Sequence, residues 1–321
     1  MSFENELRSD PVALAKRYSF FPPNKAAGFN LSTDVNAKAL EGDFAGFTRS
    51  QVKKDKKIAR VTLKLGLSSR GECLLVEPTL GGDTGVPVYY LPWDDKGAAV
   101  RMTIPEEDTA RPEDQHPKIF FTAVLSGCSI IFKGSAQCPT IYHCGTAGGE
   151  VGTPTSTKFG NSNDFFSQML SGHGYRLIGG QINSTDYMIP RSAKGADAVA
   201  ESERQFLEAL KQQPQFQRGF VLKAVVSWGS CFGVRKGGDW EFYLQQNGTL
   251  TYDTYKWEFV NRDKEVKKKT LFGSKTVTQT YTTTGKVVTP GKPISLPILV
   301  KKVFPGAGTA SMTSDLNLLQ L

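Results

Sequence analysis

Several features that mark specialised protein classes are absent from this sequence. No apolar run approaches the roughly 20 residues that span a bilayer, and the first 20 residues lack the apolar stretch and small-residue cleavage site of a secretion signal. Ser2 is not a myristoylation glycine, and the C-terminus carries no prenylation cysteine. We therefore expect a protein made without a cleavable signal peptide and without stable membrane insertion.

Cysteine and cofactor motifs are also scarce. The 321 residues include five cysteines, which are Cys73, Cys128, Cys138, Cys144 and Cys231. This low and odd number argues against a disulfide framework and favours a reducing compartment. Neither GxGxxG nor GxxxxGK[ST] is present, and no helix-turn-helix, zinc-finger or aromatic-basic strand signature points to nucleic acid. We expect no cofactor and no nucleic-acid partner.

Positive charge is present in excess and is clustered. The formal net charge is +8, and lysines gather at residues 53–57 and 264–269. The simplest interpretation is a pair of solvated loops that flank strands. The alternative is a docking surface for an acidic partner or a membrane face.

Short β-strands dominate the pattern from residue 60 onward. Apolar and polar residues alternate over 60–65, and a turn and a second apolar run follow, which predicts a hairpin. Further strands are predicted at residues 88–93, 118–125, 129–134, 140–145, 220–229, 232–235, 240–246, 250–260, 276–288 and 293–304. Helices are few and are predicted after Asp10, at 163–172 and at about 195–213. This pattern favours an α+β fold with a β-sandwich-like core of mixed sheets and peripheral helices.

The most informative stretch is residues 120–149, because it holds a cysteine and a histidine on neighbouring predicted strands. Cys128 follows Gly127, and His143 lies fifteen positions downstream, after a Gly-containing loop. An imidazole beside a thiol can take its proton and create a nucleophile. Backbone N–H groups of Gly127 and Cys128 are candidates to stabilise an oxyanion. The spacing predicts a Cys128–His143 dyad.

Two other interpretations stay open on the residues alone. Both residues can be structural, since most buried cysteines are inert. Cys138, His143 and Cys144, with Cys128, are also possible zinc ligands, although no CxxC pair exists and adjacent strand residues point to opposite faces. His116 lies in a polar loop and is expected to be a surface turn residue.

The segments LPW at 91–93, FFTAVLSGC at 120–128 and IYHCG at 141–145 together resemble the bacterial glutamine deamidase toxins. The nearest pattern is that of the Burkholderia lethal factor type, and the catalytic domain of the cytotoxic necrotizing factors is more distant. The resemblance covers about residues 60–260. It implies that Cys128 is the nucleophile and His143 the base, with Thr122 grouped beside them, on a β-sandwich wrapped by helices. In necrotizing factors a backbone carbonyl orients the histidine instead, and the strand around residues 89–91 is the candidate for that role.

The resemblance also implies a function and a domain organisation. It implies an effector, made in the bacterial cytoplasm, that acts as a monomer in the host cytosol and deamidates a glutamine of a host protein. The candidate substrates are Rho-family GTPases and the translation initiation factor 4A helicase. We divide the chain into an N-terminal extension, residues 1–50, and a single catalytic domain, residues 51–321, with a strand-rich C-terminal part. Transglutamination, a thiol protease or acyltransferase with the same dyad, and a non-catalytic module that binds host proteins remain as alternatives.

Overall fold

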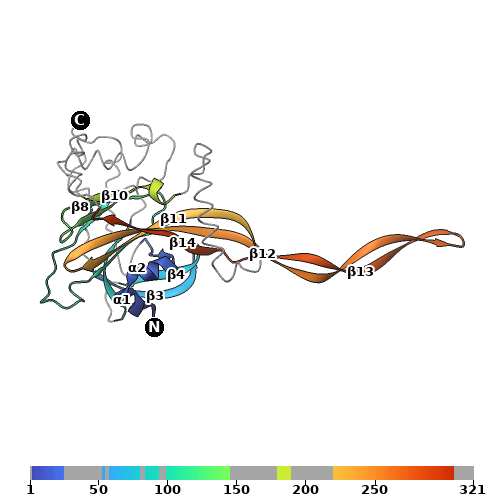
Figure 1. The fold of residues 1–321 in the computed structure, drawn as a ribbon, viewed down its shortest axis with the longest axis horizontal. Coiled ribbons are helices and arrows are strands. Elements are labelled where there is room, and N and C mark those ends of the chain that lie inside the picture. The colour runs from blue at the N-terminus through green and yellow to red at the C-terminus, as the bar shows by residue number, and fades with distance from the viewer. Residues whose placement is uncertain are drawn as a thin grey trace, which may run out of the picture.

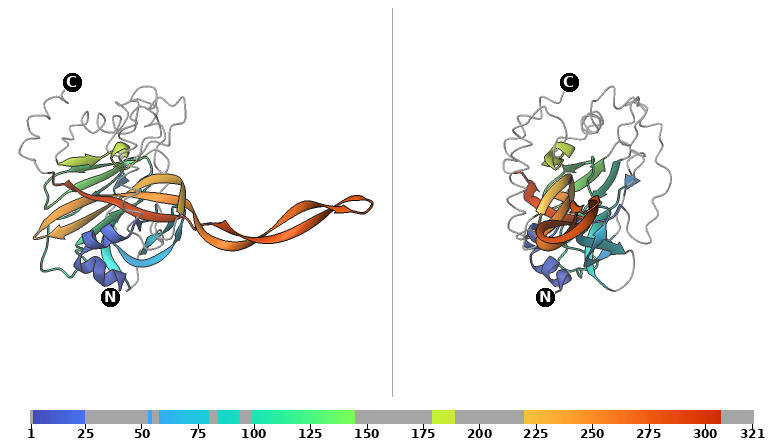
Figure 2. Two further views of the ribbon diagram at one scale, coloured as in Figure 1. Left: turned by 45° about the vertical axis from the view of Figure 1, so that its right-hand side comes forward. Right: turned by 90° about the vertical axis from the view of Figure 1, so that its right-hand side faces the viewer.

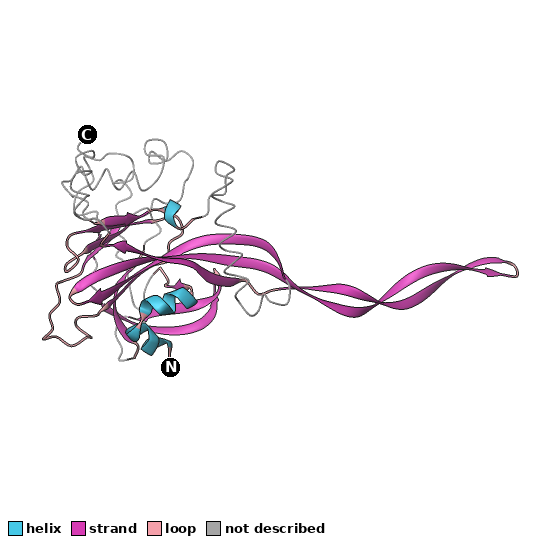
Figure 3. Ribbon diagram, in the orientation of Figure 1, coloured by secondary structure: helices cyan, strands magenta, loops and turns pink. Residues whose placement is uncertain are grey.

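The computed structural model describes residues 2–24, 53–54, 58–79, 84–93, 99–144, 179–188 and 220–306. These residues form two β-sheets, two short helices beside them and one long hairpin that extends away from the body (Figures 1 and 3). The helices predicted at 163–172 and about 195–213 lie outside the described residues.

Two short helices open the chain. They are α1 (Phe3–Ser9) and α2 (Pro11–Arg17). The Asp10 carboxylate accepts the Ala13 N–H at 2.9 Å and so caps α2. Pro11 occupies the first turn of α2, where its missing N–H costs nothing. The helix predicted after Asp10 is confirmed, whereas α1 was not anticipated because its seven residues are too short for a clear period.

The first half of the predicted N-terminal extension packs into the body instead. Leu7 and Leu14 are fully buried, and β1 (Phe20–Phe21) pairs with a strand of the larger sheet. The buried Gln245 side chain accepts the Phe20 N–H at 2.9 Å. Residues 2–24 therefore belong to the domain, which differs from the predicted boundary at residue 50, while residues 25–50 lie outside the described part of the chain.

The larger sheet closes on itself. Besides β1, its strands are β3 (Ile58–Ser68), β4 (Gly71–Thr79), β5 (Val86–Leu91), β7 (Ile119–Thr122), β11 (Phe220–Lys236), β12 (Asp239–Thr270), β13 (Gly273–Pro290) and β14 (Ile294–Phe304). The order is β1-β4-β14-β12-β11-β7-β5-β3, and a further pairing of β3 with β4 joins the two ends of this path. The predicted hairpin at residues 60–79 is this β3–β4 pair.

The smaller sheet carries the segment that the sequence singled out. Its strands are β2 (Lys53–Lys54), β6 (Ala99–Thr103), β8 (Ser129–Lys133), β9 (Thr140–Cys144) and β10 (Gly180–Ile182). They lie in the order β10-β8-β9-β6-β2, and β8 and β9 pair antiparallel, as predicted for the strands on either side of the Gly-containing loop.

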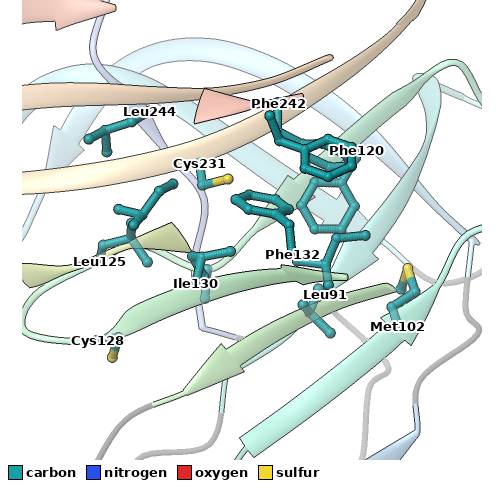
Figure 4. Close-up of a cluster of buried hydrophobic side chains, with 14 of the residues drawn as sticks. Leu91, Met102, Phe120, Leu125, Cys128, Ile130, Phe132, Cys231, Phe242 and Leu244 are labelled. Atoms are coloured by element: carbon teal, nitrogen blue, oxygen red, sulfur yellow. The ribbon is translucent and has the colours of Figure 1, made fainter. Parts of the chain in front are cut away.

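An aromatic core joins the two sheets (Figure 4). Phe132 of the smaller sheet contacts Phe242 of the larger sheet with ring centroids 4.9 Å apart, and Phe120 lies 5.3 Å from Phe242. Full burial of each such side chain stabilises the fold by about 1.5–3 kcal/mol. The protein is thus mainly β, with two sheets and short peripheral helices. It differs from the predicted sandwich because one sheet closes into a ring.

Strands β11 and β12 are longer than the sequence predicted. Four separate strands were expected over residues 220–260, but the backbone pairing of β11 with β12 is continuous from residue 220 to residue 254, with one irregularity near Leu222. The two strands meet in a tight turn at residues 236–239, where Gly237 and Gly238 have φ angles of 57° and 92°, which glycine tolerates best.

The distal parts of β12 and β13 form a free-standing hairpin. Within the described residues, β11 and β14 pair with β12 only as far as Thr254, and from Tyr255 to Thr270 the partner of β12 is β13 alone. Figure 2 shows this pair leaving the body as a single two-stranded ribbon. Most of its side chains are exposed on both faces.

Candidate active site

His143 lies in the centre of the smaller sheet and is fully buried. It stands on β9, where it is paired with Ile130 of β8 and Val100 of β6. Its ring stacks on Trp93, with ring centroids 4.6 Å apart and an interplanar angle of 14°. Trp93 reaches this position because β5 ends at Leu91, just before it. The histidine therefore has a fixed ring plane.

Thr122 fixes the hydrogen-bonding state of His143. The Thr122 hydroxyl lies 2.7 Å from Nδ1 of His143 and 2.9 Å from the carbonyl oxygen of Leu91. A hydroxyl has one proton, and a carbonyl can only accept, so Thr122 donates to Leu91. Its oxygen then accepts the Nδ1–H of His143, and this network assigns the tautomer with a bare Nε2. Parallel pairing of β5 with β7 sets Leu91 beside Thr122.

The other ring nitrogen of His143 has no partner. Nε2 is buried, and no hydrogen bond to it is formed in the described structure. Buried polar atoms are rarely left unpaired, and an exception points to strain or to a functional role. Burial also lowers the pKa of His143 to about 3, so the resting imidazole is neutral. The site thus holds an oriented, uncharged imidazole with an unused acceptor.

Cys128 directly precedes β8, at one end of the buried cluster (Figure 4). Its sulfur points away from the aromatic side chains in that view, and 8% of the residue is exposed. Gly127 before it has a φ angle of 121°, a conformation that side chains other than glycine rarely adopt. Burial raises the pKa of the Cys128 thiol to about 12, against a smaller opposing effect of a hydrogen bond from the Ser126 backbone. The resting thiol is therefore protonated.

Cys128 directly precedes the strand that pairs with the strand of His143, and no hydrogen bond joins the two side chains in the described structure. Ile130 is directly opposite His143, and Ser129 is opposite Cys144. Cys128 immediately precedes Ser129, so it lies one position beyond this pairing, at the end of the β8–β9 ladder. Cys128 also contributes to the raised pKa of the Cys144 thiol, after the larger effect of burial, so its sulfur lies near the end of β9.

Tyr187, which the sequence did not reveal, holds the cysteine loop. Its hydroxyl accepts the Gly127 N–H at 2.8 Å and donates to the Cys128 carbonyl at 2.7 Å. The Gly127 N–H, predicted as an oxyanion donor, is therefore already occupied in this structure, and the N–H of Cys128 remains as the candidate. Tyr187 lies 59 positions from Cys128 and carries no motif, so nothing in the sequence pattern links the two.

Possible metal ligands and His116 are the remaining candidate site residues. Within the described ranges, no group of three or more His, Cys, Asp or Glu side chains is arranged to hold a metal ion. His116 is buried rather than exposed, because its loop folds back and its Nε2 accepts the Asp108 N–H at 3.0 Å. It lines a charged cavity of about 420 Å³ with Arg8, Glu113 and neighbouring residues, and neither dyad residue borders that cavity.

Comparisons with known proteins add no relative. No protein-family model matches the chain, and no curated protein is significantly similar to it. The described helices include none that is long and apolar enough to cross a membrane. The features that bear on function are therefore the motifs at residues 91–93, 120–128 and 141–145 and the contacts of His143.

Proposed function

We propose that this chain is a protein-glutamine deamidase with Cys128 as nucleophile and His143 as general base. The observation that carries the proposal is the hydrogen bond from His143 Nδ1–H to Thr122, which leaves a buried, unpartnered Nε2 on the strand next to β8, and Cys128 directly precedes β8. A purely structural histidine would be expected to use both ring nitrogens once it is fully buried.

The first half of the reaction releases ammonia. The Cys128 thiol gives its proton to Nε2 of His143 as the sulfur attacks the carboxamide carbon of a glutamine side chain. The C–S bond forms, and the carbonyl π electrons move to oxygen, where the Cys128 N–H can donate to the developing charge. The imidazolium then returns its proton to the departing nitrogen, the C–N bond breaks, and a thioester remains.

The second half restores the enzyme. Water gives a proton to Nε2 of His143 and adds to the thioester carbon. The tetrahedral intermediate collapses with cleavage of the C–S bond, and the sulfur leaves with the proton from the imidazolium. The product is glutamate, ionised at neutral pH. Thr122 keeps Nδ1 protonated throughout, so that Nε2 is the nitrogen that accepts and returns the proton.

The Cys128 thiol and the His143 imidazole are both neutral in the resting protein. A thiol with a pKa near 12 and an imidazole with a pKa near 3 do not exchange a proton spontaneously. Transfer becomes favourable when the sulfur begins to bond to carbon, because the acidity of the S–H group then rises and the charge moves to the oxyanion. We infer that Cys128 becomes nucleophilic only in the presence of a bound carboxamide.

The substrate and the place of action follow from the resemblance to deamidase toxins alone. We propose a host protein as substrate, with a Rho-family GTPase or the translation initiation factor 4A helicase as candidates, and the host cytosol as the site of action. Conversion of a glutamine replaces a neutral amide by a carboxylate and removes two hydrogen-bond donors. Such a change is disabling when it falls in the target's own catalytic site.

The test compares wild type with Cys128→Ser on host-cell lysate and on the purified candidate substrates. Peptide mass spectrometry measures glutamine-to-glutamate conversion, and a coupled assay measures ammonia. Cys231→Ser is the matched control, because Cys231 is also buried in the same core but has no histidine partner among the described residues.

The expected result is conversion by wild type and Cys231→Ser and none by Cys128→Ser. Equal conversion by all three, or no conversion of any host protein by wild type, would overturn the deamidase proposal. Peptide-bond cleavage without ammonia release would identify a thiol protease that uses the same dyad. Incorporation of added amine in place of water would identify a transglutaminase.

A further inference from the structure

The tip of the β12–β13 hairpin exposes two large apolar side chains that contact nothing. Leu271 and Phe272 connect the strands, and they are 98% and 101% exposed. A two-residue hairpin turn normally uses Asn, Asp or Gly, which suit its backbone geometry and are solvated. Leucine and phenylalanine contribute neither property, so their side chains have no evident role in folding the turn.

The tip is also the most basic part of the described chain. Residues 266–275 contain four lysines and no acidic residue. Lys267, Lys268, Lys269 and Lys275 are all exposed. Lys268 and Lys275 are directly opposite each other across the strand pair, which is an unfavourable arrangement of like charges. Lys267 and Lys269 occupy the other face, because side chains alternate along a strand. Positive charge therefore surrounds the apolar pair.

The rest of the hairpin is mostly polar, apart from exposed aromatic residues such as Trp257 and Phe259, and it holds the tip away from the body. Sixteen residues, Tyr255 to Thr270, pair with β13 alone, which corresponds to a reach of about 50 Å. Cross-strand hydrogen bonds support this stem, from Thr280 to Asp263 at 2.6 Å and from Thr282 to Asn261 at 2.9 Å. Figure 1 shows the tip as the point farthest from the two sheets. A contact at the tip would therefore leave the candidate active site uncovered.

We propose that this tip docks reversibly on an anionic membrane surface. Leu271 and Phe272 would enter the headgroup region, and the four lysines would lie against lipid phosphates and carboxylates. A membrane fits better than a protein partner because a stable protein interface buries about 800 Å² on each side, and two side chains on a thin ribbon offer far less. Lipid binding needs no such area, since each buried apolar side chain and each lysine near the surface contributes separately.

The test is co-sedimentation of the full chain with vesicles. Phosphatidylserine–phosphatidylcholine vesicles are compared with pure phosphatidylcholine at low salt and at physiological salt. The variants are Phe272→Ser and Lys268→Gln. Their matched controls are Phe259→Ser, an aromatic residue of the stem that is 83% exposed, and Lys301→Gln, an exposed lysine of the body.

We expect binding to the anionic vesicles that falls as salt shortens the Debye length. Lys268→Gln should weaken partitioning about fivefold, and Phe272→Ser about three- to tenfold, while both controls stay at the wild-type value. Phe272→Trp should show a blue-shifted emission on anionic vesicles. The proposal is overturned if the chain does not bind vesicles, which includes the case of a tip that binds only an acidic protein. It is also overturned if the control variants lose as much vesicle binding as the tip variants. Ammonia release without vesicles is unaffected by these variants, so this proposal and the deamidase proposal fail separately.

Discussion

Replacing Thr122 by valine removes one hydroxyl from a buried site without changing its volume much. The His143 Nδ1–H loses its acceptor, while the Leu91 carbonyl still accepts the Ala123 N–H at 3.2 Å. An unpaired buried donor costs about 1–3 kcal/mol. We therefore expect Thr122→Val to lower the free energy of unfolding by about 2 kcal/mol, measured by urea denaturation.

The effect of Thr122→Val on catalysis should be much larger than its effect on folding. Without the hydroxyl, the imidazole can move its proton to Nε2, and that tautomer cannot accept the Cys128 proton. Loss of correct tautomer and general-base action lowers rates by about 10²–10⁴-fold. Thr122→Ser keeps the hydroxyl and should retain most of the activity, which separates the hydrogen bond from the shape of the side chain.

Nitrogen NMR gives a readout of the tautomer that does not depend on knowing the substrate. The chain has three histidines, so the two His143 ring nitrogens can be assigned with the help of a His143→Gln variant. We expect the proton on Nδ1 in wild type and in Thr122→Ser, and a shift toward Nε2 in Thr122→Val. Unchanged tautomer and unchanged ammonia release in Thr122→Val would refute the role assigned to this hydroxyl.

Three further predictions address the surroundings of the site. Tyr187→Phe removes the hydroxyl that is hydrogen-bonded to the backbone of both Gly127 and Cys128. It should lower the free energy of unfolding in urea by about 1–3 kcal/mol and reduce ammonia release. If neither value changes, these two hydrogen bonds are unimportant. Gln245→Leu removes the amide that hydrogen-bonds the N-terminal residues to β12. It should lower the free energy of unfolding by about 3 kcal/mol and increase proteolysis near the N-terminus. Resistance to proteolysis equal to that of wild type would contradict this prediction. The pKa of Glu241 is lowered to about 2, first by the Tyr243 hydroxyl and then by Lys236, so the ionised carboxylate stabilises the fold above about pH 4.5 and this stabilisation is lost as the pH falls toward 2. After allowance for solvent screening, we expect the ionised carboxylate to contribute about 1 kcal/mol to the free energy of unfolding, and we expect Glu241→Gln to lack this contribution. Identical dependence of the free energy of unfolding on acid pH in the two proteins would contradict this prediction.

The antiparallel pairing of β8 with β9 could be predicted because it is local. Two apolar segments flank a short loop that contains Gly134 and Pro139, and an antiparallel hairpin follows from that pattern alone. His143 then lies on β9, and Cys128 directly precedes the neighbouring strand β8. The neutrality of both groups could not be predicted, because their burial depends on side chains distant in the sequence, such as Trp93, which follows β5 of the larger sheet.

Features that depend on distant pairings were not predictable. The Thr122 contact requires β7 to lie parallel to β5, and the Tyr187 contact joins positions 59 residues apart; neither leaves a periodic signal. The ring closure of the larger sheet is of the same kind, since β3 meets both β4 and β5. Only the resemblance to deamidase toxins suggested that Thr122 lies beside His143, and the two side chains are in contact.

The hairpin tip illustrates a different limit of sequence analysis. The segment at 264–269 was interpreted first as a solvated loop, and residues 276–288 were correctly predicted to be a strand. Beyond Phe259, neither face of the β12–β13 stem has a continuous apolar row, which is the pattern expected of a strand pair with no sheet or helix to cover it. This pattern indicates a hairpin that projects from the body. The two apolar residues at its end are then too far from the hydrophobic core to be buried in it. A solvated loop explains the lysines but not Leu271 and Phe272, whereas contact with an anionic lipid surface explains both.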